Sequence, residues 1–296
     1  MRIILMRGVA RLAVAATLCP LALTGCGADA ADTGGTDVVA SAYPFAYVAE
    51  RIGGDQVDVE NLTSPGVEPH DVELAPQQVA TVGESDLLVY ADGFQPAVDA
   101  AVDQSGLAPD ALLDITAVGG VDAESDPHVW LDPSQLATIA QAVAAGLAEI
   151  DPQGADGYRH NAAALVRELT ALDRAFEREL ASCRSRTVIT SHDAFGHLGL
   201  RYDLEIVPIT GLDPTQEPTP AQQAEIADTV TEEGVTTIFT ERLVSPAVAE
   251  SIASESGART AVLDPIEGLS EDTGDEDYQS LMRANLEALV ETNGCR

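Results

Sequence analysis

Short apolar runs rich in β-branched residues alternate along the chain with longer amphipathic segments. The runs are Val38–Ala42, Val57–Leu62, Leu87–Ala91 and, weakly, Leu112–Thr116 in the first half, then Thr187–Ser191, Glu205–Thr210, Thr236–Thr240 and Thr260–Leu263. Each run is typical of a buried strand. The amphipathic segments predict helices, among them Pro76–Gly83, Pro96–Asp103, Pro220–Glu233, Pro246–Ser256 and Tyr278–Glu291. The alternation predicts two doubly wound (β/α)4-type lobes with mainly parallel sheets.

Two long helices are predicted in the middle of the chain, and the second of them lies between the halves. The first begins at Asp132-Pro133, where Asp suits the N-cap and Pro the first helical position, and continues to Ile150. In the second, from about Ala155 to Ala181, apolar residues recur in steps of three and four. At 1.5 Å per residue that helix would run roughly 40 Å, long enough to brace both lobes and restrict them to small rocking. We therefore expect a linking helix over 153–182, between an N-terminal lobe, 37–152, and a C-terminal lobe, 183–296.

The first 25 residues have the features of a targeting segment. Arginines are followed by an apolar stretch, Leu12–Leu23, which is too short to span a bilayer. Small residues then precede Cys26, in a pattern that resembles the lipobox of bacterial lipoproteins, where the cysteine carries the lipid. An ordinary cleaved signal with an incidental Cys26 is the alternative. Either interpretation places the mature chain outside the cytoplasm, behind a signal peptide, 1–25, and a flexible tether, 26–36.

The cysteine pattern agrees with export. Cys19 leaves with the signal and Cys26 is assigned to the lipid, so Cys183 and Cys295 remain as thiols. Two thiols in an oxidising compartment predict a disulfide, which would tie the C-terminus back to the start of the second half.

The charge of the chain excludes one class of partner. With 49 acidic and 15 basic residues the net charge is −34, so the chain would be repelled by nucleic acid and by anionic membrane surfaces. The acidity would serve solubility, or it would enrich cations near the surface.

Four candidate metal ligands follow predicted strands. His192 comes directly after the strand Thr187–Ser191, and Asp264 follows the last strand. His70 and His128 lie on loops of the first half, each ahead of a helix. Open parallel sheets bind ligands outside the carboxyl ends of their strands. If the lobes face each other, the four side chains can converge.

Four motifs in this order resemble the zinc and manganese receptors of bacterial ABC importers, and the resemblance covers essentially the whole mature chain. They are Glu68-Pro69-His70, Asp126-Pro127-His128-Val129-Trp130-Leu131-Asp132-Pro133, Ser191-His192-Asp193-Ala194-Phe195-Gly196 and Val262-Leu263-Asp264-Pro265. Those receptors are solute-binding lipoproteins whose two lobes are joined by a rigid helix. The resemblance implies that the metal is held by one residue from each motif, here His70, His128, His192 and Asp264, and is passed to a membrane permease.

The expected cargo is Zn²⁺. Three imidazoles and a carboxylate suit a tetrahedral zinc ion, whereas the related manganese receptors commonly have an acid at the position of His192. Zn²⁺ outbinds Mn²⁺ at any such site, so Mn²⁺ and Fe²⁺ remain alternatives. The sequence also lacks the histidine-rich insertion that many zinc receptors carry, since 119–126 contains acids but no histidine.

The two other histidines are not expected to bind the metal. His197 lies five residues after His192, about 140° around a helix, and the resembled family usually has an aromatic residue there. We therefore interpret His197 as a packing residue, and His160, on the linking helix, as solvated.

The predicted class is a monomeric metal receptor with no enzymatic step. A zinc hydrolase is an alternative, because three histidines and a water form a known catalytic arrangement. The fourth position would then be filled by Asp264, however, and Glu241 is the sole tempting general base. A surface adhesin is a further alternative, as a second role.

Overall fold

The computed structural model describes residues 35–120, 126–270 and 273–296, which all belong to one unit, Gly34–Arg296. The predicted signal peptide, Cys26 and the tether up to residue 34 lie outside the described residues. Among the described helices, none is both long enough and apolar enough to cross a membrane.

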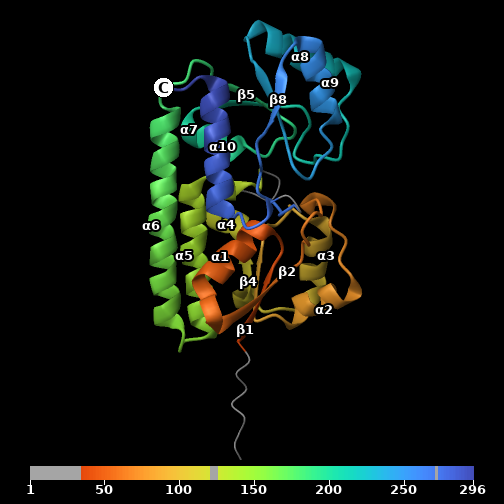
Figure 1. Cartoon of the computed structure of the whole chain (residues 1–296). Helices are drawn as coiled ribbons and strands as arrows, with labels where there is room; N and C mark the ends of the chain where they lie inside the picture. Colours follow the sequence, from red (N-terminus) through yellow and green to blue (C-terminus); the bar gives the residue numbers. More distant parts are fainter. Residues whose placement is uncertain (1–34, 121–125, 271–272) are drawn as a thin grey trace, which may run out of the picture. The chain divides into compact units, whose positions relative to one another are not determined.

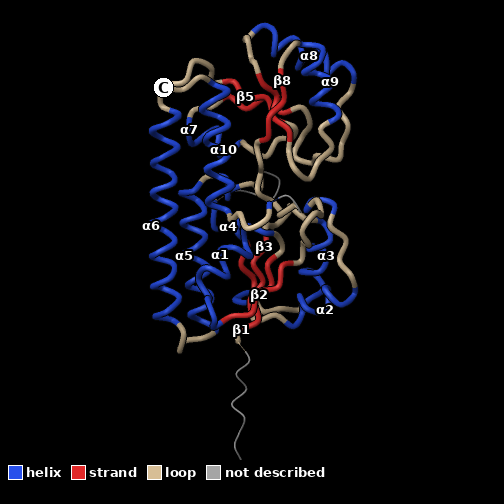
Figure 2. Tube along the Cα trace, in the orientation of Figure 1, coloured by secondary structure: helices blue, strands red, loops and turns tan. Residues whose placement is uncertain are grey.

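Two parallel sheets form the framework (Figure 2). The first has the order β2-β1-β3-β4 and consists of β1 (Thr36–Ala40), β2 (Val57–Asn61), β3 (Leu87–Tyr90) and β4 (Leu112–Asp114). The second has the order β6-β5-β7-β8 and consists of β5 (Thr187–Thr190), β6 (Glu205–Pro208), β7 (Thr237–Thr240) and β8 (Arg259–Val262). We call the parts of the chain around these sheets the first and the second lobe. The predicted fold class is confirmed.

Burial on both faces explains why the central strands are so apolar. In the first sheet Val38 of β1 pairs with Val59 of β2 on one side and with Leu87 of β3 on the other. Val38 and its neighbour Val39 are at most 2% exposed although their side chains point to opposite faces. Helices must therefore cover both faces, as parallel sheets require.

The helices follow the predicted pattern with two additions. In the described residues they are α1 (Tyr43–Gly53), α2 (Pro76–Glu84), α3 (Pro96–Ser105), α4 (Ile115–Gly119), α5 (Pro133–Ile150), α6 (Ala155–Leu180), α7 (Gly196–Tyr202), α8 (Pro220–Glu232), α9 (Ala247–Ser256) and α10 (Tyr278–Asn293). The apolar pattern did not single out α1 or α4. At α4 the Asp114 carboxylate accepts hydrogen bonds from the backbone N–H groups of Thr116 and Ala117, so a helix begins where the pattern predicted more strand.

The linking helix α6 is continuous, and its apolar stripe is buried. Tyr158, Leu165, Leu169 and Phe176 are 0% exposed. The helix packs against α5 and α1 of the first lobe and against α10, which lies beside it (Figure 1). Helix α10 follows β8 in the chain but packs on α6, so the second lobe and the linking helix share one interface. The division of the chain at residues 152 and 183 therefore remains a prediction.

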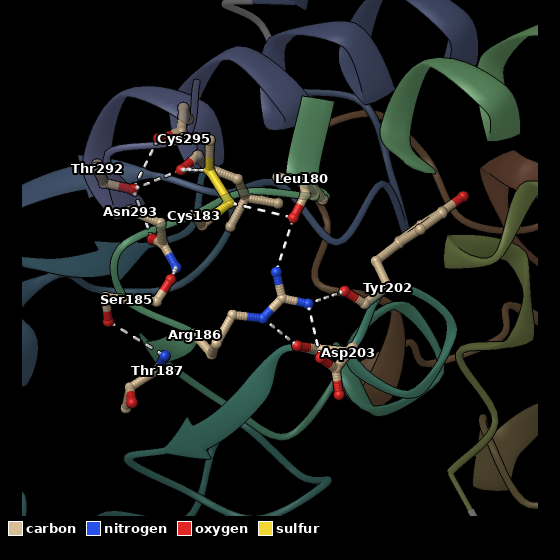
Figure 3. Close-up of a disulfide and its surroundings, with 12 residues drawn as sticks. Leu180, Cys183, Ser185, Arg186, Thr187, Tyr202, Asp203, Thr292, Asn293 and Cys295 are labelled. Atoms are coloured by element: carbon tan, nitrogen blue, oxygen red, sulfur yellow. Dashed lines mark hydrogen bonds and ion pairs between the residues drawn. A yellow bond between two sulfur atoms is a disulfide. The ribbon is translucent and has the colours of Figure 1, made fainter. Parts of the chain in front are cut away.

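A disulfide joins the ends of α6 and α10. It links Cys183, just after α6, to Cys295, just after α10 (Figure 3). Close to it, the Arg186 guanidinium donates hydrogen bonds to the carbonyl oxygens of Leu180, 2.7 Å away, and Tyr202, 2.6 Å away. The C-terminal end of the linking helix is therefore held both covalently and by hydrogen bonds.

Replacing both cysteines, in Cys183→Ser/Cys295→Ser, should lower the free energy of unfolding by about 2–5 kcal/mol, because the open chain gains entropy when a loop of this length is released. Urea denaturation of the variant, beside the parent with and without reductant, measures the loss. A variant as stable as the oxidised parent would show that the bond contributes nothing.

Candidate metal centre

Three histidines and one carboxylate converge between the two sheets. One ligand atom from each of His70, His128, His192 and Glu267 lies within 4.8 Å of the other three. The Glu267 Oε1 atom is 2.9 Å from His128 Nε2, 3.2 Å from His192 Nε2 and 3.7 Å from His70 Nε2. Four ligands of a tetrahedral zinc ion lie roughly 3.3 Å apart, because each bond is about 2.0–2.1 Å long. The group therefore needs little rearrangement to hold such an ion.

The four atoms are buried and lack hydrogen-bond partners. The three Nε2 atoms and Glu267 Oε1 have no contact of hydrogen-bond geometry with the described residues, although the ion-pair distances are short. Buried polar atoms are nearly always partnered in native proteins. Four such atoms that point to one place indicate a site for a cation.

Carboxylates behind two of the histidines set the direction of their rings. The Nδ1 atom of His128 lies 2.6 Å from Asp126 Oδ1, and that of His192 lies 2.8 Å from Glu241 Oε1. Because a carboxylate accepts, each Nδ1 must carry a proton, which leaves Nε2 as the nitrogen that can bind a metal ion. Metal-binding histidines are commonly oriented by such contacts. Neither Asp126 nor Glu241 was predicted in this role.

The topology of the second sheet explains one of these pairs. His192 follows β5 and Glu241 follows β7, and these strands are neighbours at the centre of the sheet. The connections after β5 and β7 run to opposite edges of the sheet, which opens a crevice between them. The pair of side chains lies at that crevice.

His70 is positioned by a short 3-10 helix, Pro69–Asp71. The Glu68 carboxylate accepts a hydrogen bond from Asp71 N, and the buried Gln95 amide donates to the carbonyl oxygen of Pro69. The ring of His70 also meets the ring of Phe94 edge-on at 4.6 Å between centroids. His70 thus lies on a fixed turn.

The structure places the predicted carboxylate ligand outside the group and Glu267 inside it. Asp264 lies outside the group: its Oδ2 accepts from Arg242 Nε at 2.9 Å, and its Oδ1 accepts from Ile266 N at 2.8 Å. The second bond closes a turn in which Ile266 has a φ of +57°, a left-handed conformation that is rare for a β-branched residue. Asp264 therefore shapes the loop that presents Glu267. The Asp-Pro pair, typical of a turn, was the signal for this role.

The loop that carries Glu267 is attached to the first lobe. Its backbone accepts hydrogen bonds from Trp130 Nε1 at Pro265, 2.8 Å, and from Tyr43 N at Glu267, 3.2 Å. A third bond, of 2.7 Å, runs from Gly66 N to Leu269 O. The fourth position of the group thus comes from the second lobe but is held by the first.

The charges in this group support one another. Burial disfavours the Glu267 carboxylate, but the surrounding histidines hold its pKa well below the usual range. Burial also opposes a charged His192, yet Glu241 and Glu267 raise its pKa to about 11. Burial together with the charge of Glu267 raises the pKa of Glu68 to about 8. Protons and a metal dication therefore compete for the same anionic pocket.

The two remaining histidines lie outside the group, as expected. His160 is exposed on α6, and His197, on α7, contacts Asp126 and Gln135 instead.

A comparison with known families identifies this architecture. The model of the family described as zinc-uptake complex component A, periplasmic, matches residues 38–292. The chain belongs to this family.

Individual relatives agree with that assignment. The chain is 32% identical over 276 residues to the high-affinity zinc uptake system protein ZnuA of Bacillus subtilis, covering 86% of each chain. It is 31% identical to the zinc-binding lipoprotein AdcA of Streptococcus pneumoniae over 94% of its own length, and spans 60% of that longer protein.

Solved structures show the same fold. The Zn(II)-bound ZnuA-like domain of Streptococcus pneumoniae AdcA superposes with a TM-score of 0.76 at 32% identity, over 88% of this chain and 99% of that domain. The laminin-binding protein Lmb of Streptococcus agalactiae, described as bifunctional with adhesin and metal transporting activity, has a TM-score of 0.78 at 32% identity, over 87% and 99%. The predicted family is confirmed, and the prediction of a metal receptor agrees with the descriptions of these relatives, which name zinc binding, zinc uptake or metal transport.

The two acids of the loop can be separated by mutation. Glu267→Gln should weaken zinc binding by about 100-fold or more, because it removes the sole carboxylate of the group. Asp264→Asn keeps an acceptor for Ile266 N and should cost about tenfold at most. Competition with a chromophoric chelator measures both, and an equal loss in the two variants would restore Asp264 as a ligand.

Zinc affinity should fall as the pH falls from about 8 to about 6. The raised pKa values of His128 and His192 mean that both rings stay protonated up to a higher pH than a free histidine. Each proton that zinc must displace costs about tenfold in zinc affinity per pH unit. Calorimetric titrations in buffers of different ionisation enthalpy count the protons released. Equal affinity at both pH values, with no proton release, would contradict a histidine site.

Proposed function

We propose that this chain is an extracytoplasmic receptor that captures Zn²⁺ between its two lobes and delivers it to the membrane permease of an ABC importer. The observation that carries this proposal is the convergence of three imidazole Nε2 atoms and one carboxylate oxygen, all buried and without hydrogen-bond partners in the described residues. The ligands are His70, His128, His192 and Glu267.

The ligand chemistry supports zinc as the cargo. Nitrogen donors outnumber oxygen donors in the group, a set that zinc accepts readily and manganese does not favour. The membership of the zinc-uptake family adds to this support. Mn²⁺ would bind the same residues more weakly.

Access to the ion is expected from the side of His70. Its side chain is 10% exposed, whereas those of His128 and His192 are fully buried. His70 would therefore be the first histidine to meet an incoming ion and the last to leave it. The aromatic rings of Phe94 and Trp130 lie against His128, at 5.7 and 5.1 Å between centroids, and exclude water on that side.

The family and the first residues of the chain support a location outside the cytoplasm. We infer that the mature protein is a monomer, attached to the membrane by a lipid on Cys26 after removal of residues 1–25. The description of AdcA as a zinc-binding lipoprotein supports this inference. The tether, 26–36, would leave the receptor free to reach its permease.

An adhesive role is a second candidate, because structural neighbours of this chain are described as laminin-binding proteins. A hydrolase has less support. The tempting general base, Glu241, contacts His192 Nδ1, on the side of the ring away from Nε2, and this position does not favour proton transfer from a water on the metal.

Calorimetric titration of a soluble form that begins after Cys26 should show one tightly bound Zn²⁺ per chain. In His192→Ala the binding should collapse, because one of three nitrogen ligands is lost. His160→Gln, an exposed change on α6, is the control and should bind like the parent.

Two outcomes would overturn the proposal. The first is a parent that binds no zinc. The second is a His192→Ala variant that binds as tightly as the parent, which would move the binding to the acidic surface. Metal content of the protein after growth with mixed trace metals decides between zinc and manganese.

A further inference from the structure

His197 spans from the second lobe to the loop that carries His128. It lies in the first turn of α7, and its Nε2 is 2.8 Å from the carbonyl oxygen of Asp126. Its Nδ1 is 3.1 Å from Nε2 of Gln135, on α5. A carbonyl oxygen accepts and an amide nitrogen donates, so the two contacts fit the tautomer that carries its proton on Nε2. Both ring nitrogens are satisfied in this one tautomer.

Asp126 transmits the position of His197 to the metal group. Its carbonyl oxygen accepts from His197, while its Oδ1 accepts from both the backbone N and the Nδ1 of His128, at 2.9 and 2.6 Å. The same residue therefore fixes the proton on His128 Nδ1 and is itself fixed from the second lobe. A displaced Asp126 would release the ring of His128.

Gly196 provides a second, independent contact at the same place. A Cβ atom built on Gly196 would lie 2.6 Å from Asp126 Oδ2, closer than real Cβ contacts allow. The absence of a side chain at Gly196 thus lets the start of α7 approach the Asp126 carboxylate directly. The backbone of Gly196 is not left-handed, so this requirement is steric and not conformational.

The other end of α7 is attached to the linking helix. The Arg201 guanidinium donates to Asp173, 2.8 Å, and to Glu177, 2.7 Å, and the Tyr202 hydroxyl donates to Asp173 at 3.0 Å. Asp173 and Glu177 lie on α6. The helix that carries His197 is therefore not free to follow a moving Asp126.

We propose that His197 is a positioning residue for the metal centre, which holds Asp126 and so the ring of His128 in the orientation that binds the ion. This inference rests on the proposed function, because it concerns the same site. It also corrects the interpretation of His197 as a packing residue: an aromatic ring would fill the same space but would offer neither hydrogen bond.

The test compares two replacements of similar size. His197→Phe keeps a ring and loses both hydrogen bonds, whereas His197→Gln retains a donor for Asp126 O and an acceptor for Gln135. Changes behind a metal-binding histidine commonly cost 10–100-fold in affinity. We expect His197→Phe to release zinc to a chelator about tenfold faster than the parent, and His197→Gln to stay within about threefold.

The Co²⁺ form gives a readout that altered stability alone would not change. The visible absorption of bound Co²⁺ depends on the geometry of its ligands, so it should shift in His197→Phe and return to the parent spectrum in His197→Gln. Gly196→Ala, which leaves His197 intact but displaces Asp126, should resemble His197→Phe. His160→Gln is the matched control on an exposed histidine, and urea unfolding of the metal-free forms checks that each variant is folded.

The outcomes separate this inference from the proposed function. If the parent binds one zinc and His128→Ala abolishes it, but folded His197→Phe and Gly196→Ala match the parent in rate and spectrum, His197 has no positioning role. His197 also has no positioning role if His197→Gln behaves like His197→Phe, because altered packing would then explain the effects of both variants. If the parent binds no zinc, the proposed function fails first.

Discussion

A negative charge buried among imidazoles is the constraint on which this architecture depends. Glu267 is 3% exposed, and its Oε1 meets three Nε2 atoms that have no other partner in the described residues. Isolated buried charges are too costly to persist, so they are paired or bind metals. Asp126 and Glu241 add two more carboxylates directly behind His128 and His192. Only protons or a metal cation can balance so much negative charge in one place, which makes the interior a cation receptor before any detail of geometry is considered.

The fold that builds this pocket could be predicted almost entirely from the chain. Strands buried on both faces appear as short apolar runs, and α6 appears as an uninterrupted stripe of apolar residues that ends close to its predicted bounds. The helices that escaped prediction did so for local reasons. The decisive signal at α4 is one hydrogen-bonding side chain, Asp114, and a periodicity analysis does not register it. In helix α1 the charged residues are confined to Glu50 and Arg51 near its end, after an apolar run, so no repeated polar positions mark it as a helix in the sequence.

The site was predicted less completely, and the reason is geometric. The three histidines follow strands or precede helices on loops, so the topology alone places them at one edge of each sheet. The carboxylate is different, because its loop has to be traced residue by residue. Asp264 stands at the end of β8, where a ligand is expected, but Arg242 and the turn at Ile266 use its oxygens. Such a turn is visible in the sequence as Asp-Pro, but its consequence, that the next acid enters the pocket, is not.

The loop that carries Glu267 has a consequence for the time that an ion stays bound. Its hydrogen bonds to Trp130, Tyr43 and Gly66 all cross from one lobe to the other, and the Tyr278 hydroxyl behind it also donates to the carbonyl oxygen of Trp130. Spreading the lobes apart would break these contacts together, whereas peeling this loop away would break them one at a time. Detachment of this loop alone would therefore remove Glu267 from the group without any separation of the lobes. A partner that bound this loop would speed the release of the ion, because its docking would break the contacts with the first lobe in one step.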